Sequence, residues 1–164
     1  MITELPFGLP GKVYRSAMPF GLYDADEETM GLYRENNISV IVLLAEEMEC
    51  LRKAKRNLYD MYLEQGFRVI HLPIADFNIP SIEELARAVD RTIECARAGR
   101  NVAIHCSGGI GRTGTFAACM AKKLFNLPSD QGIAWVRKYI AQAIETPEQE
   151  RLVIDYEAGG RPPR

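Results

Sequence analysis

The residues best suited to chemistry lie in one short segment, HCSGGIGRTG at positions 105–114, called here the Cys106 loop. Within it, Cys106 and Arg112 are separated by five residues, three of which are glycines. Glycines let backbone N–H groups turn inward and converge on one point. The planar guanidinium adds two parallel donors that match phosphate oxygens. The spacing therefore predicts a cradle for a phosphate dianion with a thiol at its base.

The elements expected on either side of the loop favour the same chemistry. The segment NVAIH at 101–105 predicts a buried strand before it, and a helix is expected from about 113 to 125. A helix N-terminus attracts anions, and together with Arg112 it favours the nucleophilic thiolate of Cys106. We expect Cys106 to attack phosphorus, Thr113 to donate its hydroxyl to the sulfur, and His105 to hold the loop by hydrogen bonds. The residues expected to bind phosphate are Ser107, Gly108, Gly109, Ile110, Gly111 and Arg112.

The order of the expected elements indicates the fold class. Apolar runs predict strands at 38–44, 67–72 (ended by Pro73) and 101–105, and helical patterns cover 24–37, 46–65, 81–98, 113–125, 130–141 and 147–156. Ser81 begins a capping box, and 6–11 and 159–164 are Pro/Gly-rich ends. Strands that alternate with helices predict one α/β domain over 1–164, with a mostly parallel central sheet flanked by helices on both faces. Ligands of such sheets bind beyond the carboxyl ends of the strands.

The overall composition restricts the possible partners. The 164-residue chain has a net charge of −2 and a pI near 5.8, so no nucleic-acid surface is expected. The N-terminus lacks a secretory pattern and no window is apolar enough for a membrane span, which predicts a cytoplasmic protein. No metal site is expected, because the cysteines and histidines lack ligand spacing, and no cofactor is implied. We also expect a monomer. Cys50, Cys95 and Cys119 are expected to pack in helices, with a redox role for Cys119 left open.

The Cys106 loop resembles the signature loop of the protein tyrosine phosphatase superfamily, Cys-x5-Arg followed by Ser or Thr. The short chain is similar, from about Val13 to Tyr156, to the compact dual-specificity group and to small archaeal and bacterial tyrosine phosphatases. The resemblance implies the cysteine-phosphatase fold, with a short strand near 11–16. It also implies that a phosphorylated protein is hydrolysed through a cysteinyl phosphate, at phosphotyrosine and also at phosphoserine or phosphothreonine.

A general acid is expected on a second loop. Residues 71–81, HLPIADFNIPS, follow a strand, are bounded by prolines and carry one acid, Asp76. Spacing alone fits a solvated turn residue equally well. The resemblance to the family's acid loop implies that Asp76 protonates the leaving group and later acts as a base.

Two further segments each have two interpretations. The segment ETPEQE at 145–150 resembles the family's glutamine loop, which implies that Gln149 orients the attacking water, with Gln142 as the alternative; the Thr-Pro pair also predicts a capped helix start. One of Glu46, Glu47 and Glu49 is expected to steady Arg112. Equally, these acids are simply favourable at a helix N-terminus.

Other functions fit the sequence less well. The Cys106 loop has no lysine or extra arginine, which disfavours a phosphoinositide substrate, and the chain is too short for the pocket-deepening loop of classical tyrosine phosphatases. Hydrolysis of RNA 5′-phosphates is disfavoured by Asp76 and the acidic pI. A binding module would need no nucleophile. Arsenate reductases and rhodanese-like phosphatases share Cys-x5-Arg, but an upstream Asp76 and the GRTG ending favour the dual-specificity type.

Overall fold

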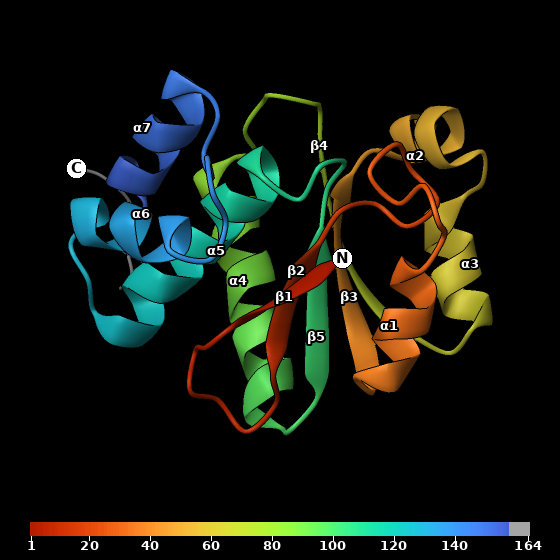
Figure 1. The fold of residues 1–164 in the computed structure, drawn as a ribbon. Coiled ribbons are helices and arrows are strands. Elements are labelled where there is room, and N and C mark those ends of the chain that lie inside the picture. Colours follow the sequence, from red (N-terminus) through yellow and green to blue (C-terminus); the bar gives the residue numbers. More distant parts are fainter. Residues whose placement is uncertain (158–164) are drawn as a thin grey trace.

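The computed structural model describes residues 1–157, so the expected Pro/Gly-rich end at 159–164 lies outside the described residues. Within this part the chain forms a five-stranded sheet in the order β1-β2-β5-β3-β4 (Figure 1). The strands are β1 (Ile2–Leu5), β2 (Val13–Ser16), β3 (Ile38–Ala45), β4 (Arg68–Ile74) and β5 (Asn101–His105). The helices are α1 (Thr29–Glu35), α2 (Glu47–Ala54), α3 (Leu58–Glu64), α4 (Ile82–Arg97), α5 (Gly111–Phe125), α6 (Ser129–Arg137) and α7 (Pro147–Asp155).

The sheet is mostly parallel, as predicted. β2 and β3 flank β5 in parallel, and β4 joins β3 in parallel, whereas only β1 of the described strands runs antiparallel, against β2. The parallel strands therefore end at one edge of the sheet, and the loops that follow β2, β3, β4 and β5 meet there. This is the edge at which ligands of parallel α/β sheets bind.

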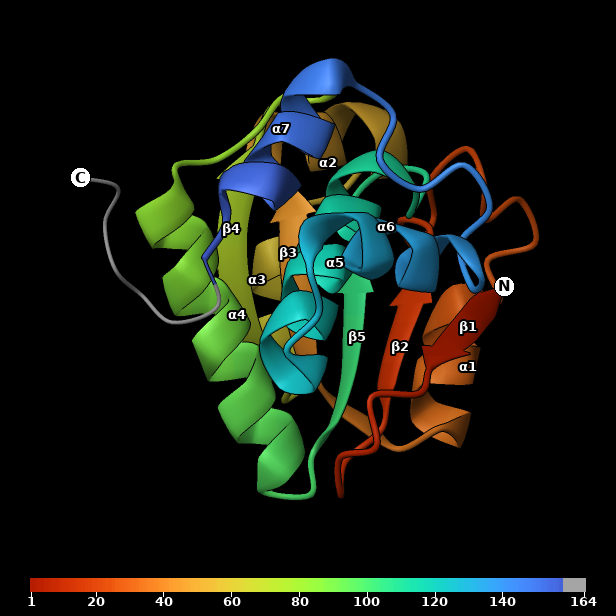
Figure 2. The same cartoon turned by 90° about the vertical axis from the view of Figure 1, so that its left-hand side faces the viewer.

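Helices cover both faces of the sheet, which confirms the predicted α/β fold class. α4, α5, α6 and α7 lie on one face and α1, α2 and α3 on the other (Figures 1 and 2). Side chains of β3 alternate between two apolar clusters, because successive residues of a strand point to opposite faces. Val40, Val42 and Leu44 join the cluster beneath α4–α7, and Ile41 and Leu43 join the one beneath α1–α3.

The prediction of a single helix over 46–65 was wrong, because the structure divides this segment into α2 and α3. Lys55 adopts a left-handed conformation with φ of 57°, which ends α2. Asn57 then begins α3, where its side-chain oxygen accepts the N–H of Asp60 at 3.2 Å. An asparagine three residues before an acid is an N-cap signal that the longer apolar pattern obscured.

Smaller differences concern the ends of elements. The helix expected from 24 begins at Thr29, because the Asp24 carboxylate instead accepts the Thr29 N–H and hydroxyl at 3.1 and 2.7 Å. β4 continues through Pro73, which an edge strand tolerates since one side of it needs no ladder partner. β1 was not predicted, because four residues carry too little periodicity. The cap at Ser81 is confirmed: its hydroxyl accepts the N–H of Glu84 at 3.3 Å.

Replacement of Asn57 by alanine tests the division between α2 and α3. We expect Asn57→Ala to lower the free energy of unfolding by about 1 kcal/mol, because the N–H of Asp60 loses its acceptor. Urea denaturation measures this change. Asn57→Ser keeps a side-chain acceptor, loses the same amide donor to Glu47 and Asp60, and is the matched control; an equal loss in both variants would contradict the cap.

Candidate active site

Cys106 lies where β5 gives way to α5, at the carboxyl edge of the sheet. Its side chain is buried beneath the loop, and the Thr113 hydroxyl donates a hydrogen bond to its sulfur at 3.2 Å. α5 begins at Gly111, so Arg112 and Thr113 both belong to its first turn. The predicted loop between strand and helix is therefore present, and the first turn of α5 holds both the predicted phosphate-binding arginine and the predicted sulfur donor.

The middle of the Cys106 loop is held against the end of β2. Gly109 has φ of +71°, and a Cβ placed on it would lie 2.2 Å from the Ser16 carbonyl oxygen. Only glycine fits this approach, because both the backbone conformation and the space exclude a side chain. The Met18 N–H donates to the Ser107 carbonyl at 2.8 Å. The loop is thus fixed on the β2 side by backbone contacts.

The Arg112 guanidinium makes four hydrogen bonds and is buried. Nη1 donates to Glu49 Oε2 and to the Ile74 carbonyl, both at 2.7 Å. Nη2 donates to Glu49 Oε1 at 2.9 Å and to Asp76 Oδ1 at 2.7 Å. Burial lowers the pKa of Arg112, but the hydrogen bonds that it donates to Glu49 and the negative charges of Cys106, Glu49 and Asp76 raise it overall. Arg112 therefore stays a cation in the loop.

Glu49 is the glutamate that contacts Arg112. Its carboxylate is 1% exposed and meets the guanidinium through both oxygens. Burial raises the pKa of Glu49, but hydrogen bonds from Arg112 and Lys53 lower it overall. Glu46 instead precedes α2 as its N-cap residue, and Glu47 accepts a bond from Asn57. The expectation that one of the three acids supports Arg112 thus resolves to Glu49.

Lys53 belongs to the site and was missed from the sequence. Its ammonium donates to Glu49 Oε1 at 2.7 Å, Asp76 Oδ2 at 2.8 Å and Ser107 Oγ at 3.0 Å. Lys53 lies four residues after Glu49 on α2, so the two share one helix face. That spacing was the available signal. The lysine links the Cys106 loop to Asp76, which also contacts Arg112 and so lies beside the loop as predicted.

His105 is buried and neutral. The Cys106 carbonyl accepts its Nδ1–H at 3.0 Å, so Nε2 is the acceptor for the Tyr62 hydroxyl at 2.8 Å. Burial lowers the pKa of His105 to about 4. These contacts agree with the expectation that His105 holds the loop rather than acting as a base. Tyr62, on α3, is a second support that the sequence did not reveal.

Gln149 lies beside the start of α5. Its Oε1 accepts the Glu145 N–H at 2.9 Å and its Nε2 donates to the Asn78 carbonyl at 3.4 Å. A Cβ on Gly111 would lie 3.1 Å from Gln149 Oε1. Gln142 is exposed in the connection between α6 and α7. The structure therefore brings Gln149 to the Cys106 loop and the acid loop (residues 75–80), consistent with its choice over Gln142.

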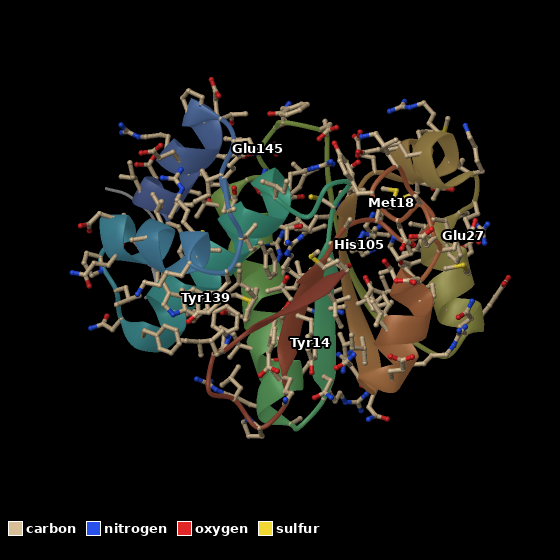
Figure 3. All side chains as sticks on the ribbon, in the orientation of Figure 1. Tyr14, Met18, Glu27, His105, Tyr139 and Glu145 are labelled. Atoms are coloured by element: carbon tan, nitrogen blue, oxygen red, sulfur yellow. The ribbon has the colours of Figure 1, made fainter. Side chains whose placement is uncertain are left out.

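An open pocket leads to the loop. Its lining combines charged residues with apolar and aromatic side chains: Leu22, Tyr23, Lys53, Asp76, Phe77, Ser107, Gly108, Ile110 and Glu145. Tyr23 and Phe77 are more than half exposed, at 63% and 61%. Figure 3 shows Met18, His105 and Glu145 in its upper half, at the carboxyl edge of the sheet. The pocket therefore combines charged side chains with two exposed aromatic rings, Tyr23 and Phe77, called here the aromatic rim.

Some other types of site are not formed by the described residues. Within 1–157, no three His, Cys, Asp or Glu side chains gather as metal ligands. None of the helices in that range is both long and apolar enough to cross a membrane. Cys50, Cys95 and Cys119 are buried free thiols in α2, α4 and α5.

Comparison with known proteins agrees with this geometry. Residues 18–126 match the family model described as "Polymorphic toxin system, DSP-PTPase phosphatase". The chain is 31% identical over 141 residues to the human dual specificity protein phosphatase CDC14C, covering 85% of this chain but only 29% of that protein. The crystal structure of Tk-PTP in the active form superposes with a TM-score of 0.78 at 30% identity, covering 94% of this chain and 95% of that one. Kinase associated phosphatase, at 24% identity and a TM-score of 0.84 over 95% and 93% of the two chains, shares the fold.

The chain therefore belongs to the dual-specificity and tyrosine phosphatase family, which confirms the resemblance drawn from the Cys106 loop.

The buried neutral His105 predicts a pH dependence of stability. Its pKa is about 4 when folded against 6.5 when unfolded, so between these values the unfolded chain binds the extra proton. Stability should therefore be full above about pH 6.5 and fall by about 3 kcal/mol as pH drops to 4. Urea denaturation at pH 7 and 4.5 measures how far the free energy of unfolding falls between these two values in wild type and in His105→Gln. The fall should be smaller in His105→Gln, and an equal fall in both proteins would contradict this assignment. His71→Gln is the control histidine variant.

Proposed function

We propose that this chain is a metal-independent cysteine phosphatase that hydrolyses phosphotyrosine, and also phosphoserine or phosphothreonine, in protein substrates. The observation that carries the proposal is the convergence of three groups at one loop. The Thr113 hydroxyl donates to the Cys106 sulfur at 3.2 Å, and Arg112 Nη2 donates to Asp76 Oδ1 at 2.7 Å. Arg112 and Cys106 belong to the same loop, and Asp76 lies on a second loop beside it. A nucleophile, an oxyanion-binding cation and a carboxyl group are the parts that phosphoryl transfer to a thiol requires.

In the first step, the Cys106 thiolate attacks phosphorus in line with the ester oxygen. An S–P bond forms and the P–O bond to the leaving group breaks. Arg112 and the loop N–H groups bind the equatorial oxygens, where the charge of the transferring group is concentrated. Asp76, in its protonated form, gives its proton to the leaving oxygen. In the free protein Arg112 Nη2 donates a hydrogen bond to Asp76, so a bound phosphate must displace Asp76 from that donor.

In the second step, water attacks the cysteinyl phosphate. Asp76, now ionised, takes a proton from the water, the S–P bond breaks, and Cys106 returns to the thiolate. The Thr113 hydroxyl stabilises the departing sulfur through its hydrogen bond. The Gln149 amide orients the water, which its position beside Gly111 and the acid loop supports.

The aromatic rim supports phosphotyrosine as the preferred substrate. Tyr23 and Phe77 expose most of their surface beside the pocket, where they can pack against a phenyl ring. Lys53 also lines this pocket, although the Cys106 loop itself contains no lysine. Its charge is already paired with Glu49 and Asp76, so it adds little free positive charge for a polyanionic lipid headgroup.

Matched phosphotyrosine and phosphothreonine peptides test the function directly. We expect phosphate release from both, faster from phosphotyrosine, unchanged by excess chelator and absent in Cys106→Ser. Initial rates by a phosphate assay give the comparison. If neither peptide is hydrolysed, or if Cys106→Ser retains activity, the proposal fails; in that case RNA 5′-phosphates and inositol phosphates are the next substrates to assay.

The role of Asp76 is tested by the leaving group. Asp76→Asn should lower kcat by about 10²- to 10⁴-fold on phenyl phosphate, whose phenoxide needs a proton. The loss should be much smaller on an aryl phosphate with an acidic phenol, which leaves without one. Asp90→Asn is the control, since Asp90 lies on α4 and pairs with Lys123. Equal losses on both substrates would show that the acid is elsewhere.

A further inference from the structure

Arg15 is a charged residue on the same face of the sheet as Cys106. It pairs with Ile104 in the parallel ladder of β2 and β5, and paired residues point to the same face. Ile104 and Cys106 both belong to the apolar cluster beneath α4–α7, as does Val13, two residues before Arg15. The neighbours Tyr14 and Ser16 point the other way, to the cluster beneath α1–α3 and to the Tyr33 hydroxyl. Figure 2 shows β2 beside β5 on this face.

The backbone around Arg15 meets the Cys106 loop directly. The Ser16 carbonyl lies against Gly109, and the Met18 N–H bonds the Ser107 carbonyl. The end of β2, the strand that carries Arg15, therefore borders the loop on one side, whereas Arg112 belongs to the first turn of α5, which follows the loop.

Unlike Arg112, Arg15 has no anionic partner among the described residues. None of the ion pairs formed within residues 1–157 includes Arg15. Its Nε is the one buried side-chain nitrogen or oxygen in that range without a hydrogen-bond partner. Burial of a cation without a counter-charge costs free energy. Because no paired anion cancels its field, the charge of Arg15 acts on other negative charges nearby. Burial lowers the pKa of Arg15, and the negative charge of Cys106 opposes that effect.

The other charges around Cys106 are already largely paired. Arg112 is bonded to Glu49 and Asp76, Lys53 is bonded to the same two carboxylates, and His105 is neutral. Thr113 contributes a dipole, and the carboxylate of Glu145 lies near Gly111. The polar and charged groups on the elements packed around the Cys106 loop are therefore the following: His105 on β5, Arg112 and Thr113 on α5, Glu49 and Lys53 on α2, Asp76 on the acid loop, Glu145 before α7 and Arg15 on β2.

We propose that Arg15 is an electrostatic positioning residue of this phosphatase, the unpaired cation behind the Cys106 loop that stabilises the Cys106 thiolate and the phosphate dianion bound above it. It contacts neither group and acts through its field across the loop. The role rests on the proposed function, because it requires Cys106 to work as a thiolate.

The pH dependence of Cys106 alkylation tests this role without turnover. We expect Arg15→Met to move the midpoint of iodoacetamide alkylation to higher pH, so that the rate below the midpoint falls on the order of threefold to tenfold. Inhibition by inorganic phosphate should weaken by a similar factor. Arg15→Lys keeps the charge and should restore most of both effects. Because salt screens charges, the difference between Arg15→Met and wild type should shrink in 1 M salt.

Two controls separate this field effect from a loss of packing. Arg68→Met removes an exposed arginine at the amino end of β4, far from the site in the sheet, and should leave the midpoint unchanged. Thermal melts establish that each variant is folded. A folded Arg15→Met protein, or Arg15→Gln if the former does not fold, with the wild-type midpoint and phosphate affinity would overturn the role of Arg15 alone. A wild-type midpoint at the value of a free thiol would overturn both this role and the proposed nucleophile.

Discussion

The contacts of the Arg112 guanidinium determine how the rest of the site is arranged. Its hydrogen bonds join the first turn of α5 to Glu49 on α2, to the last carbonyl of β4 and to Asp76 on the acid loop. Removing either partner of a buried ion pair leaves a charge without compensation, at a cost of roughly 3–5 kcal/mol. The fold therefore depends on the same group that we propose to bind phosphate, and stability and phosphate binding are expected to constrain this residue together.

The charges of the site are balanced in the free protein, and the proposed mechanism requires substrate to rearrange them. Lys53 and Arg112 share the carboxylates of Glu49 and Asp76, so little net charge is exposed at the pocket. A phosphate dianion brings two charges into this network and competes with Asp76 for Arg112. Glu49 is buried and remains bonded, whereas Asp76 is on a loop and 39% exposed, so Asp76 is the partner that can move. The network thus contains one carboxylate that stays bonded to Arg112, that of Glu49, and one that phosphate can displace from it, that of Asp76.

The sequence predicted most of what is local and little of what depends on contact between distant segments. The Cys106 loop, the parallel sheet and the cap at Ser81 are each encoded by neighbouring residues, and the structure contains them. Lys53 and Tyr62 reach the loop only because α2 and α3 pack beside β5. The spacing of Glu49 and Lys53 places both on one helix face but does not show what that face meets, and no local pattern marks Tyr62. The unpaired state of Arg15 is likewise a property of the folded chain. Asn57 differs, since its capping signal was present but was outweighed by the apolar periodicity around it.

The break between α2 and α3 allows one stretch of chain to support the Cys106 loop from two directions. Glu49 and Lys53 meet Arg112 and Ser107 at the open edge of the sheet, while Tyr62 meets His105 beneath the loop. A single straight helix of 20 residues would extend about 30 Å and place these side chains along one rod. Because each inserted or deleted residue rotates a helix by about 100°, a change of length within α2 or α3 would lose one of the two supports. The length of this segment is therefore as strongly constrained as its composition.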